Sequence, residues 1–192
     1  MERLLFPTLE GTWKSNIELN KYAEVLQEDT EANVFLDSNL FGKWINLLHK
    51  SWKVDYSWGG WMENREELLS GTYLPVGYRT HLGVDFWVPV NTIVYLPWDA
   101  KLVHHRYDLD QNGGWGGQLI FEVDGLYYIF GHLKHIVDFP SYRKGAAIGL
   151  VAEIEKNGGW YPHLHFQCIK TLNLDVDGYG LKQVEEFPNP MR

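Results

Sequence analysis

From about Tyr73 to the C-terminus, the chain is a series of short β-type runs separated by Gly, Asn and Pro. No helical period persists in this stretch, so it predicts sheet rather than helix. Between two of the runs, Asp124-Gly125 is a strong two-residue hairpin signal. The runs cover residues 81–90, 92–95, 100–104, 118–123, 127–132 and 163–169. The sequence therefore predicts a mainly β fold with antiparallel strands.

The first seventy residues follow a different pattern. Asp37-Ser38 can cap a helix, and the apolar residues after it recur at helical spacing. They are Leu40, Phe41, Trp44, Ile45, Leu48 and Trp52. A weaker helix is predicted over residues 17–27, with Tyr22, Val25 and Leu26 facing inward. We therefore expect a small helical N-terminal extension over residues 1–70 and a β domain over residues 71–192.

Charge and hydropathy limit the partners. The formal net charge of −8 would repel a phosphate backbone, so no nucleic-acid partner is expected. No apolar stretch is long enough to span a membrane, and the first residues lack the pattern of a signal peptide. The expected location is cytoplasmic, with a periplasmic or secreted location as the alternative if a leader has been removed. The sequence leaves the oligomeric state unknown.

Histidines and one aspartate carry the chemical signal. On a strand, His81 and Asp85 project to one face, and Gly83 between them removes a side chain that would crowd a shared ligand. His163 and His165 also face the same way on a strand, whereas on a helix they would point about 200° apart. Imidazole and carboxylate are zinc ligands, and three protein ligands leave a fourth position for water.

Each of these motifs alone has a plainer interpretation. A single His-x-His or His-x-x-x-Asp is a weak metal signal, and a lone His132 is typical of a core or edge position. The four remaining histidines, His49, His104, His105 and His135, are interpreted in this way. The sequence Gly-Gly-Trp occurs three times, ending at Trp61, Trp115 and Trp160. These segments are either turns anchored by a packed ring or loops that present rings to a substrate.

The order of the motifs resembles the lysostaphin/LytM-type zinc endopeptidases over residues 79–167. Arg79-Thr-His-Leu-Gly-Val-Asp85 resembles the first ligand motif, and Tyr128-Ile-Phe-Gly-His132-Leu133 resembles the family's Tyr-x-His-Leu element. Arg143-Lys-Gly-Ala-Ala-Ile-Gly149 resembles a conserved turn of that family, and Pro162-His-Leu-His-Phe166 is the most specific segment. Together these segments are far more specific than any one of them.

The resemblance implies a hybrid-motif β barrel with one zinc ion held by His81, Asp85 and His165. It further implies that His132 and His163 flank the open position as catalytic residues, and that the substrate is a peptide, often beside glycine in a bacterial cell wall. The chain lacks His-Glu-x-x-His, so no helix glutamate can be the general base. The two flanking histidines are therefore the candidates to accept the proton from water.

Three points depart from the family pattern or stay open. Asn157-Gly-Gly-Trp160 replaces the family's usual Thr-Gly-x-Ser/Thr-Gly run, which leaves the substrate preference open. Tyr73 or Tyr78 is a candidate hydrogen-bond donor to an oxyanion. The N-terminal extension either packs as a plain structural element or covers the groove. In the second case Asn33, Asn39 or Asn64 would approach the metal.

Two other functions compete with the peptidase. One is a non-catalytic, zinc-bound peptide-binding or regulatory module of the same fold. The other is a phosphocarrier domain, which shares the fold and uses two neighbouring histidines for phosphoryl transfer. Asp85 among the ligands favours a metal over a phosphoryl group.

Overall fold

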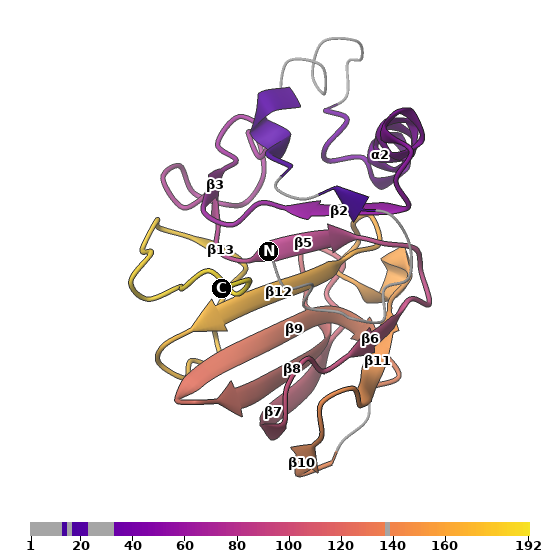
Figure 1. Ribbon diagram of the computed structural model, residues 1–192. Helices are drawn as coiled ribbons and strands as arrows, with labels where there is room; N and C mark the ends of the chain where they lie inside the picture. The colour runs from indigo at the N-terminus through magenta and orange to yellow at the C-terminus, as the bar shows by residue number, and fades with distance from the viewer. Residues whose placement is uncertain (1–12, 15–16, 23–32, 137–138) are drawn as a thin grey trace.

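The computed structural model describes residues 13–14, 17–22, 33–136 and 139–192. Most of their strands form one large sheet, which runs in the order β1-β2-β5-β12-β9-β8-β7-β10 (Figure 1), and β11 pairs with both β6 and β9. The strands of this sheet are β1 (Trp13–Lys14), β2 (Tyr56–Gly59), β5 (Val84–Trp87), β6 (Ile93–Tyr95), β7 (Ala100–Asp108), β8 (Gly116–Val123), β9 (Leu126–Lys134), β10 (Ser141–Tyr142), β11 (Ala147–Val151) and β12 (Leu164–Ile169). A small second sheet has the order β13-β4-β3, formed by β13 (Tyr179–Gly180), β4 (Thr80–His81) and β3 (Glu63–Asn64).

The mainly β, antiparallel prediction is confirmed. Among the described strands only the pair β1–β2 is parallel. The barrel is not confirmed, because the large sheet follows an open path from β1 to β10. The single run expected over residues 81–90 is wrong: the chain leaves β4 of the small sheet after His81 and enters β5 of the large sheet at Val84.

The hairpin predicted at Asp124-Gly125 is confirmed between β8 and β9. Both turn residues have positive φ, 50° and 77°, as a two-residue turn with the twist of the flanking strands requires. β9 then pairs with β12, and β12 pairs with β5 on its other side. Their register places His165 opposite both Gly131 and Asp85, so the candidate ligands lie at the centre of the sheet.

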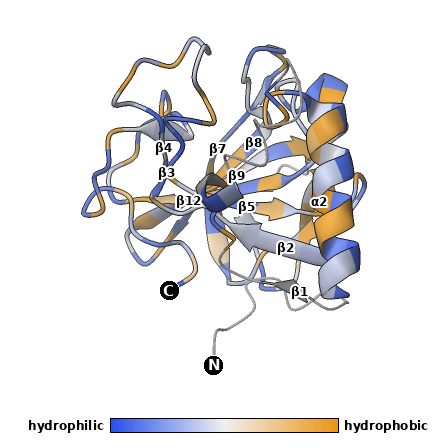
Figure 2. Ribbon diagram, turned by 90° about the horizontal axis from the view of Figure 1, so that it is seen from above, coloured by the Kyte–Doolittle hydropathy of each residue, from blue (hydrophilic) through white to orange (hydrophobic). Residues whose placement is uncertain are grey.

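The predicted helix after Asp37 is confirmed as α2 (Ser38–Trp52). The Asp37 carboxylate accepts hydrogen bonds from the backbone N–H groups of Asn39 and Leu40, which caps the helix. Phe41 and Ile45 are fully buried on its inner face. Figure 2 shows α2 beside β2 along one side of the sheet, and a hydrogen bond of 2.6 Å joins the side chains of His49 on α2 and Ser57 on β2.

Only part of the earlier predicted helix lies in the described residues. That part is a 3₁₀ turn, η1 (Leu19–Tyr22), in which the Tyr22 ring packs edge-on against Trp44 at 5.3 Å. Val25 and Leu26 lie outside the described residues. A second 3₁₀ turn, η2 (Ile154–Lys156), precedes the loop that leads into β12.

The N-terminal part of the chain shares its core with the β-rich part. Phe41 and Ile45 of α2 belong to one cluster with Trp87 of β5, and Trp160 packs against that cluster. β2, which precedes residue 70, pairs with β5. The division into residues 1–70 and 71–192 stays a prediction, with strand pairing across it. In the described parts of the chain, no helix is long and apolar enough to cross a membrane.

Candidate metal centre

Three strands bring the predicted ligands together. His81 lies on β4, Asp85 on β5 and His165 on β12, and all three side chains are almost fully buried. The chain bends between the first two ligands at Gly83, and the N–H of the preceding Leu82 donates to the Gly178 carbonyl. This bend aims His81 and Asp85 at one point from two different sheets, which a single straight strand would not do.

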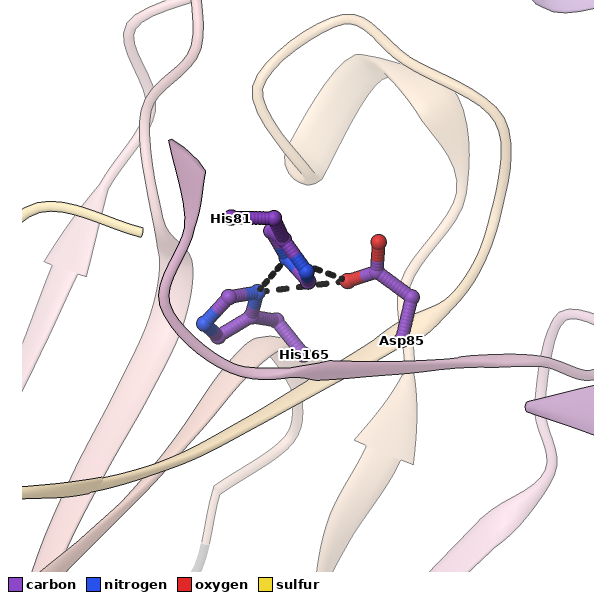
Figure 3. Close-up of side chains that lie close together, drawn as sticks. All are labelled: His81, Asp85 and His165. Atoms are coloured by element: carbon purple, nitrogen blue, oxygen red, sulfur yellow. Dashed lines mark hydrogen bonds and ion pairs between the residues drawn. The ribbon is translucent and has the colours of Figure 1, made fainter. Parts of the chain in front are cut away.

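The three ligand atoms lie at similar distances from one another (Figure 3). His81 Nε2 lies 3.1 Å from His165 Nδ1, and each of these nitrogens lies 3.2 Å from Asp85 Oδ1. These atoms form a near-equilateral triangle. A tetrahedral zinc ion with ligands at about 2.0 Å requires ligand–ligand separations of about 3.3 Å, so the spacing fits that ion.

The ring nitrogens that point away from the ligand cluster determine which nitrogen of each imidazole carries the proton. His81 Nδ1 lies 3.0 Å from the Gly60 carbonyl, which can only accept, so Nδ1 carries the proton. His165 Nε2 lies 2.9 Å from Gln167 Oε1, and the Gln167 amide nitrogen donates to the Asp177 carbonyl at 3.3 Å. The Gln167 oxygen therefore accepts from His165.

The ring nitrogens that point into the ligand cluster consequently carry lone pairs. With the protons on the outer nitrogens, His81 Nε2 and His165 Nδ1 both point a lone pair at the third acceptor, an Asp85 carboxylate oxygen. Three converging acceptors without a proton between them repel one another unless a cation lies among them. The donor set, its spacing and its outer hydrogen bonds all fit zinc.

Arg65 holds the other oxygen of the aspartate. Its Nη2 donates to Asp85 Oδ2 at 3.0 Å, its Nε donates to Glu63 Oε2 at 2.8 Å, and its Nη1 donates to the Tyr179 hydroxyl at 2.9 Å. Arg65 is fully buried. Nothing in the sequence motifs signalled this group, because Arg65 precedes the first motif and meets Asp85 only in the folded chain.

The two predicted catalytic histidines flank the triangle. His163 Nδ1 lies 2.7 Å from the Tyr161 carbonyl and so carries the proton, which turns the Nε2 lone pair toward Asp85 Oδ1 at 3.7 Å. The His132 ring lies 4.3 Å from the His163 ring, centroid to centroid, and stacks on Trp115 at 6.1 Å.

Burial and neighbouring charge keep these histidines neutral. Burial, with the Arg65 charge, lowers the pKa of His81 to about 3. Burial first, then His163 and His165, hold the pKa of His132 well below its usual value, and burial also lowers the pKa of His163. Burial alone would raise the pKa of the Asp85 carboxyl, but His81 and Arg65 outweigh it and hold that pKa well below its usual range. The site thus offers neutral imidazoles and one carboxylate, the forms that bind a metal.

A pocket of about 380 Å³ opens onto these residues. Trp115 and Trp160, from two of the Gly-Gly-Trp segments, line it, whereas Trp61 packs against the main core. The Gly-Gly-Trp segments therefore do not follow a single interpretation. Trp115 is a buried ring that anchors its turn, and it also forms part of the pocket wall. Phe35 and Tyr73 line the pocket from the N-terminal side and from the loop before β4.

Several sequence candidates lie away from the centre. The Asn33 side chain donates a hydrogen bond to the Leu68 carbonyl and accepts one from the Phe35 N–H. Neither Asn33 nor Asn39 nor Asn64 lines the pocket. Tyr73 lines the pocket but Tyr78 does not, which leaves Tyr73 as the candidate oxyanion donor. The four other histidines are not in the ligand cluster. They are His49, His104, His105 and His135.

Comparison with known proteins gives matches among solved structures only. No protein-family model matches the sequence, and no curated protein sequence does. The catalytic domain of the antimicrobial peptidase lysostaphin from Staphylococcus simulans is similar, with 24% identity and a TM-score of 0.46, covering 78% of this chain and 93% of that chain.

Two further solved structures are similar, one described as an M23 protein and one as a peptidase. A prophage-encoded M23 protein, EnpA from Enterococcus faecalis, has 18% identity and a TM-score of 0.42, covering 59% of this chain and 78% of that one. A zinc-containing peptidase from Vibrio cholerae has 24% identity and a TM-score of 0.40, covering 50% of this chain and 31% of that one. These similarities are low, so the function proposed below rests on the side chains of the site.

Replacing Gly83 with alanine is expected to weaken zinc binding and to lower the free energy of unfolding by about 1–3 kcal/mol, a typical cost of overpacking. A Cβ at Gly83 would lie 2.5 Å from His165 Nε2 and 2.7 Å from the Phe166 carbonyl oxygen, so the ligand would have to move. Chelator competition and urea unfolding measure the two effects. Gly145→Ala is the control, since nothing lies within 4 Å of its Cβ and only its φ of +83° opposes the change. Equal zinc affinity in Gly83→Ala and the natural protein would contradict this role of Gly83.

The metal-free protein is expected to lose stability as the pH falls below about 6.5. The folded pKa values of His81, His132 and His163 lie below the unfolded value, so the unfolded chain binds protons first. Their contribution is complete above that pH and falls by up to about 1.4 kcal/mol per pH unit for each histidine. His49, whose pKa burial also lowers, adds to the trend. Asp85 acts only below about pH 4, where its unfolded form protonates.

Urea unfolding with a chelator at pH 7.5, 6.5 and 5.5 measures this dependence. The His163→Gln variant should show a shallower slope than the natural protein. Identical midpoints across the series would contradict neutral, buried histidines in the folded state.

Proposed function

We propose that this protein is a zinc-dependent endopeptidase. In this proposal His81, Asp85 and His165 hold the metal, and His132 and His163 move the proton during hydrolysis of a peptide bond. The observation that carries the proposal is the triangle of three deprotonated ligand atoms, 3.1 to 3.2 Å apart, on the wall of a pocket with two further neutral histidines. When bound there, zinc would supply a Lewis acid that activates water near neutral pH and polarises a carbonyl group.

The chain's own residues then have separate tasks. His163 presents its Nε2 lone pair toward the ligand cluster, and His132 lines the pocket beside it, so the pair can accept a proton from water and return it to a leaving amine. Tyr73, which lines the pocket, is the candidate donor to the developing oxyanion. Low pKa values keep both histidines in the base form at pH 7.

The pocket wall favours a peptide without acidic side chains. Its aromatic residues are Phe35, Tyr73, Trp115, Trp160 and Tyr179, its carboxylates are Asp85 and Asp177, and no Lys or Arg lines it in the described part of the chain. Gly113, Gly158 and Gly159 have positive φ, and a Cβ at any of them would lie within 2.6 Å of an atom of this chain, so these glycines let the loops of the pocket wall pack closely. A cell-wall peptide and a glycine-rich sequence both fit this description, and neither is specified by the residues.

A peptide-library cleavage assay tests the proposal. We expect cleavage by the purified protein containing one zinc per chain, loss of cleavage after treatment with a chelator, and recovery when zinc is added back. Mass spectrometry of the products then gives the preferred residues. Stoichiometric zinc without cleavage would favour the non-catalytic peptide-binding module, and absence of bound zinc would contradict the site.

A further inference from the structure

We propose that Arg65 is a positioning residue for the metal: it holds Asp85 Oδ2 so that Oδ1 alone faces the ligand cluster. The inference rests on the metal site of the proposed function and adds to it a residue from outside the motifs. Figure 3 shows one Asp85 oxygen directed at the two histidines and the other directed away from them. Arg65 Nη2 donates to that outer oxygen at 3.0 Å.

The guanidinium is held in place on every side that the structure describes. Nε donates to Glu63 Oε2 and Nη1 to the Tyr179 hydroxyl, so each of its three nitrogens has its own acceptor. Its flat face lies 5.7 Å from the centre of the Phe35 ring. A planar group with three fixed acceptors cannot rotate without breaking two hydrogen bonds. The guanidinium therefore also fixes the orientation of the Asp85 carboxylate to which it donates.

The small sheet connects Arg65 to a second metal ligand, His81. His81 on the middle strand, β4, pairs with Glu63 on one side and with Tyr179 on the other. Both anchors of Arg65 are therefore register partners of a ligand. The Gly60 carbonyl, which orients His81, lies in the loop between β2 and β3. Gly60 is close to both residues, since a Cβ there would lie 2.5 Å from Arg65 Nη2 and 2.8 Å from His81 Nδ1.

The charges of the group explain how a buried cation can lie next to a metal site. Glu63 and Arg65 are both buried and form an ion pair, so together they add no net charge beside the metal. Among the described residues, Asp85 then supplies the one carboxylate of the ligand cluster. With Oδ2 occupied, Asp85 can offer one oxygen rather than two, which leaves a coordination position open for water or substrate.

The decisive variant is Arg65→Lys, which keeps the positive charge but removes the planar fork. We expect its zinc affinity, measured by chelator competition, to fall by about 10- to 100-fold, the usual effect of losing a partner of a metal ligand. Cobalt substituted for zinc reports the coordination. In Arg65→Lys the visible cobalt bands should weaken and shift, because a released Asp85 binds through both oxygens and raises the coordination number.

Tyr179→Phe provides a milder second variant, because it removes one acceptor of Arg65 and keeps the ring. It should show a smaller change in the same direction for both the zinc affinity and the cobalt spectrum. Arg143→Lys is the matched control, since Arg143 is exposed and pairs with Asp99, and neither residue belongs to the ligand cluster. Its zinc affinity and spectrum should equal those of the natural protein.

The outcomes separate the two proposals. Natural affinity and an unchanged cobalt spectrum in Arg65→Lys and Tyr179→Phe would overturn the role of Arg65 while leaving the metal site intact. If Arg65→Lys does not fold by circular dichroism, Tyr179→Phe decides alone by the same two measurements. A natural protein that binds neither zinc nor cobalt would overturn both proposals.

Discussion

Replacing His165 with alanine is expected to abolish stoichiometric zinc binding and to lower peptide hydrolysis by about 10³-fold or more, since a catalytic metal supplies several kcal/mol of transition-state stabilisation. His165 Nδ1 is one corner of the ligand triangle, 3.1 Å from His81 Nε2 and 3.2 Å from Asp85 Oδ1. Without it, two ligands remain, which is fewer than the three that catalytic zinc sites use. Zinc content by elemental analysis and cleavage of the best library peptide measure the two losses.

His49→Gln is the matched control for removal of a buried histidine. His49 is buried and hydrogen-bonded to Ser57, but it lies outside the ligand cluster. We expect this variant to lower the free energy of unfolding and to keep both zinc and activity. If His165→Ala still bound one zinc per chain with natural affinity, the ligand set would be wrong.

The local patterns of the sequence were sufficient for the capped helix, for the hairpin and for several of the strands. Asp37 predicts α2 because its side chain acts on the helix end two and three residues away, and Asp124-Gly125 predicts a turn that needs only its own two residues. Whether the sheet closes into a barrel depends on pairings between distant strands, which no local pattern contains. For the same reason β2 was missed, and so was β11, whose residues 147–149 were interpreted as part of a turn.

The metal ligands followed from the motifs, but the geometry behind them did not. His81 and Asp85 were assigned to one strand with a shared face. They instead meet from two sheets across the bend at Leu82-Gly83. The expected crowding at Gly83 is confirmed, since a Cβ there would overlap the His165 ring. Arg65 could not be predicted, because its contact with Asp85 spans 20 residues and depends on the small sheet.

Replacing His132 with alanine is expected to keep zinc and to lower the rate of hydrolysis by about 10²- to 10⁴-fold, the range for a general acid–base residue. His132 contributes no atom to the ligand triangle, so zinc affinity should stay at its natural value. His104→Ala is the matched control, because His104 is also partly buried with a pKa lowered by burial, yet lies on β7 outside the cluster. Peptide cleavage and zinc content are measured on the same preparations.

The comparison of the His132 and His165 variants separates binding from catalysis. The ligand triangle by itself supports only a metal site, which a non-catalytic peptide-binding module would also have. The His132 ring lies against His163 and Trp115 and lines the pocket, but it contributes no ligand atom. A residue in that position can act on the proton without binding the metal. Zinc retained with natural cleavage in His132→Ala would overturn this role and assign the proton transfer to His163 alone.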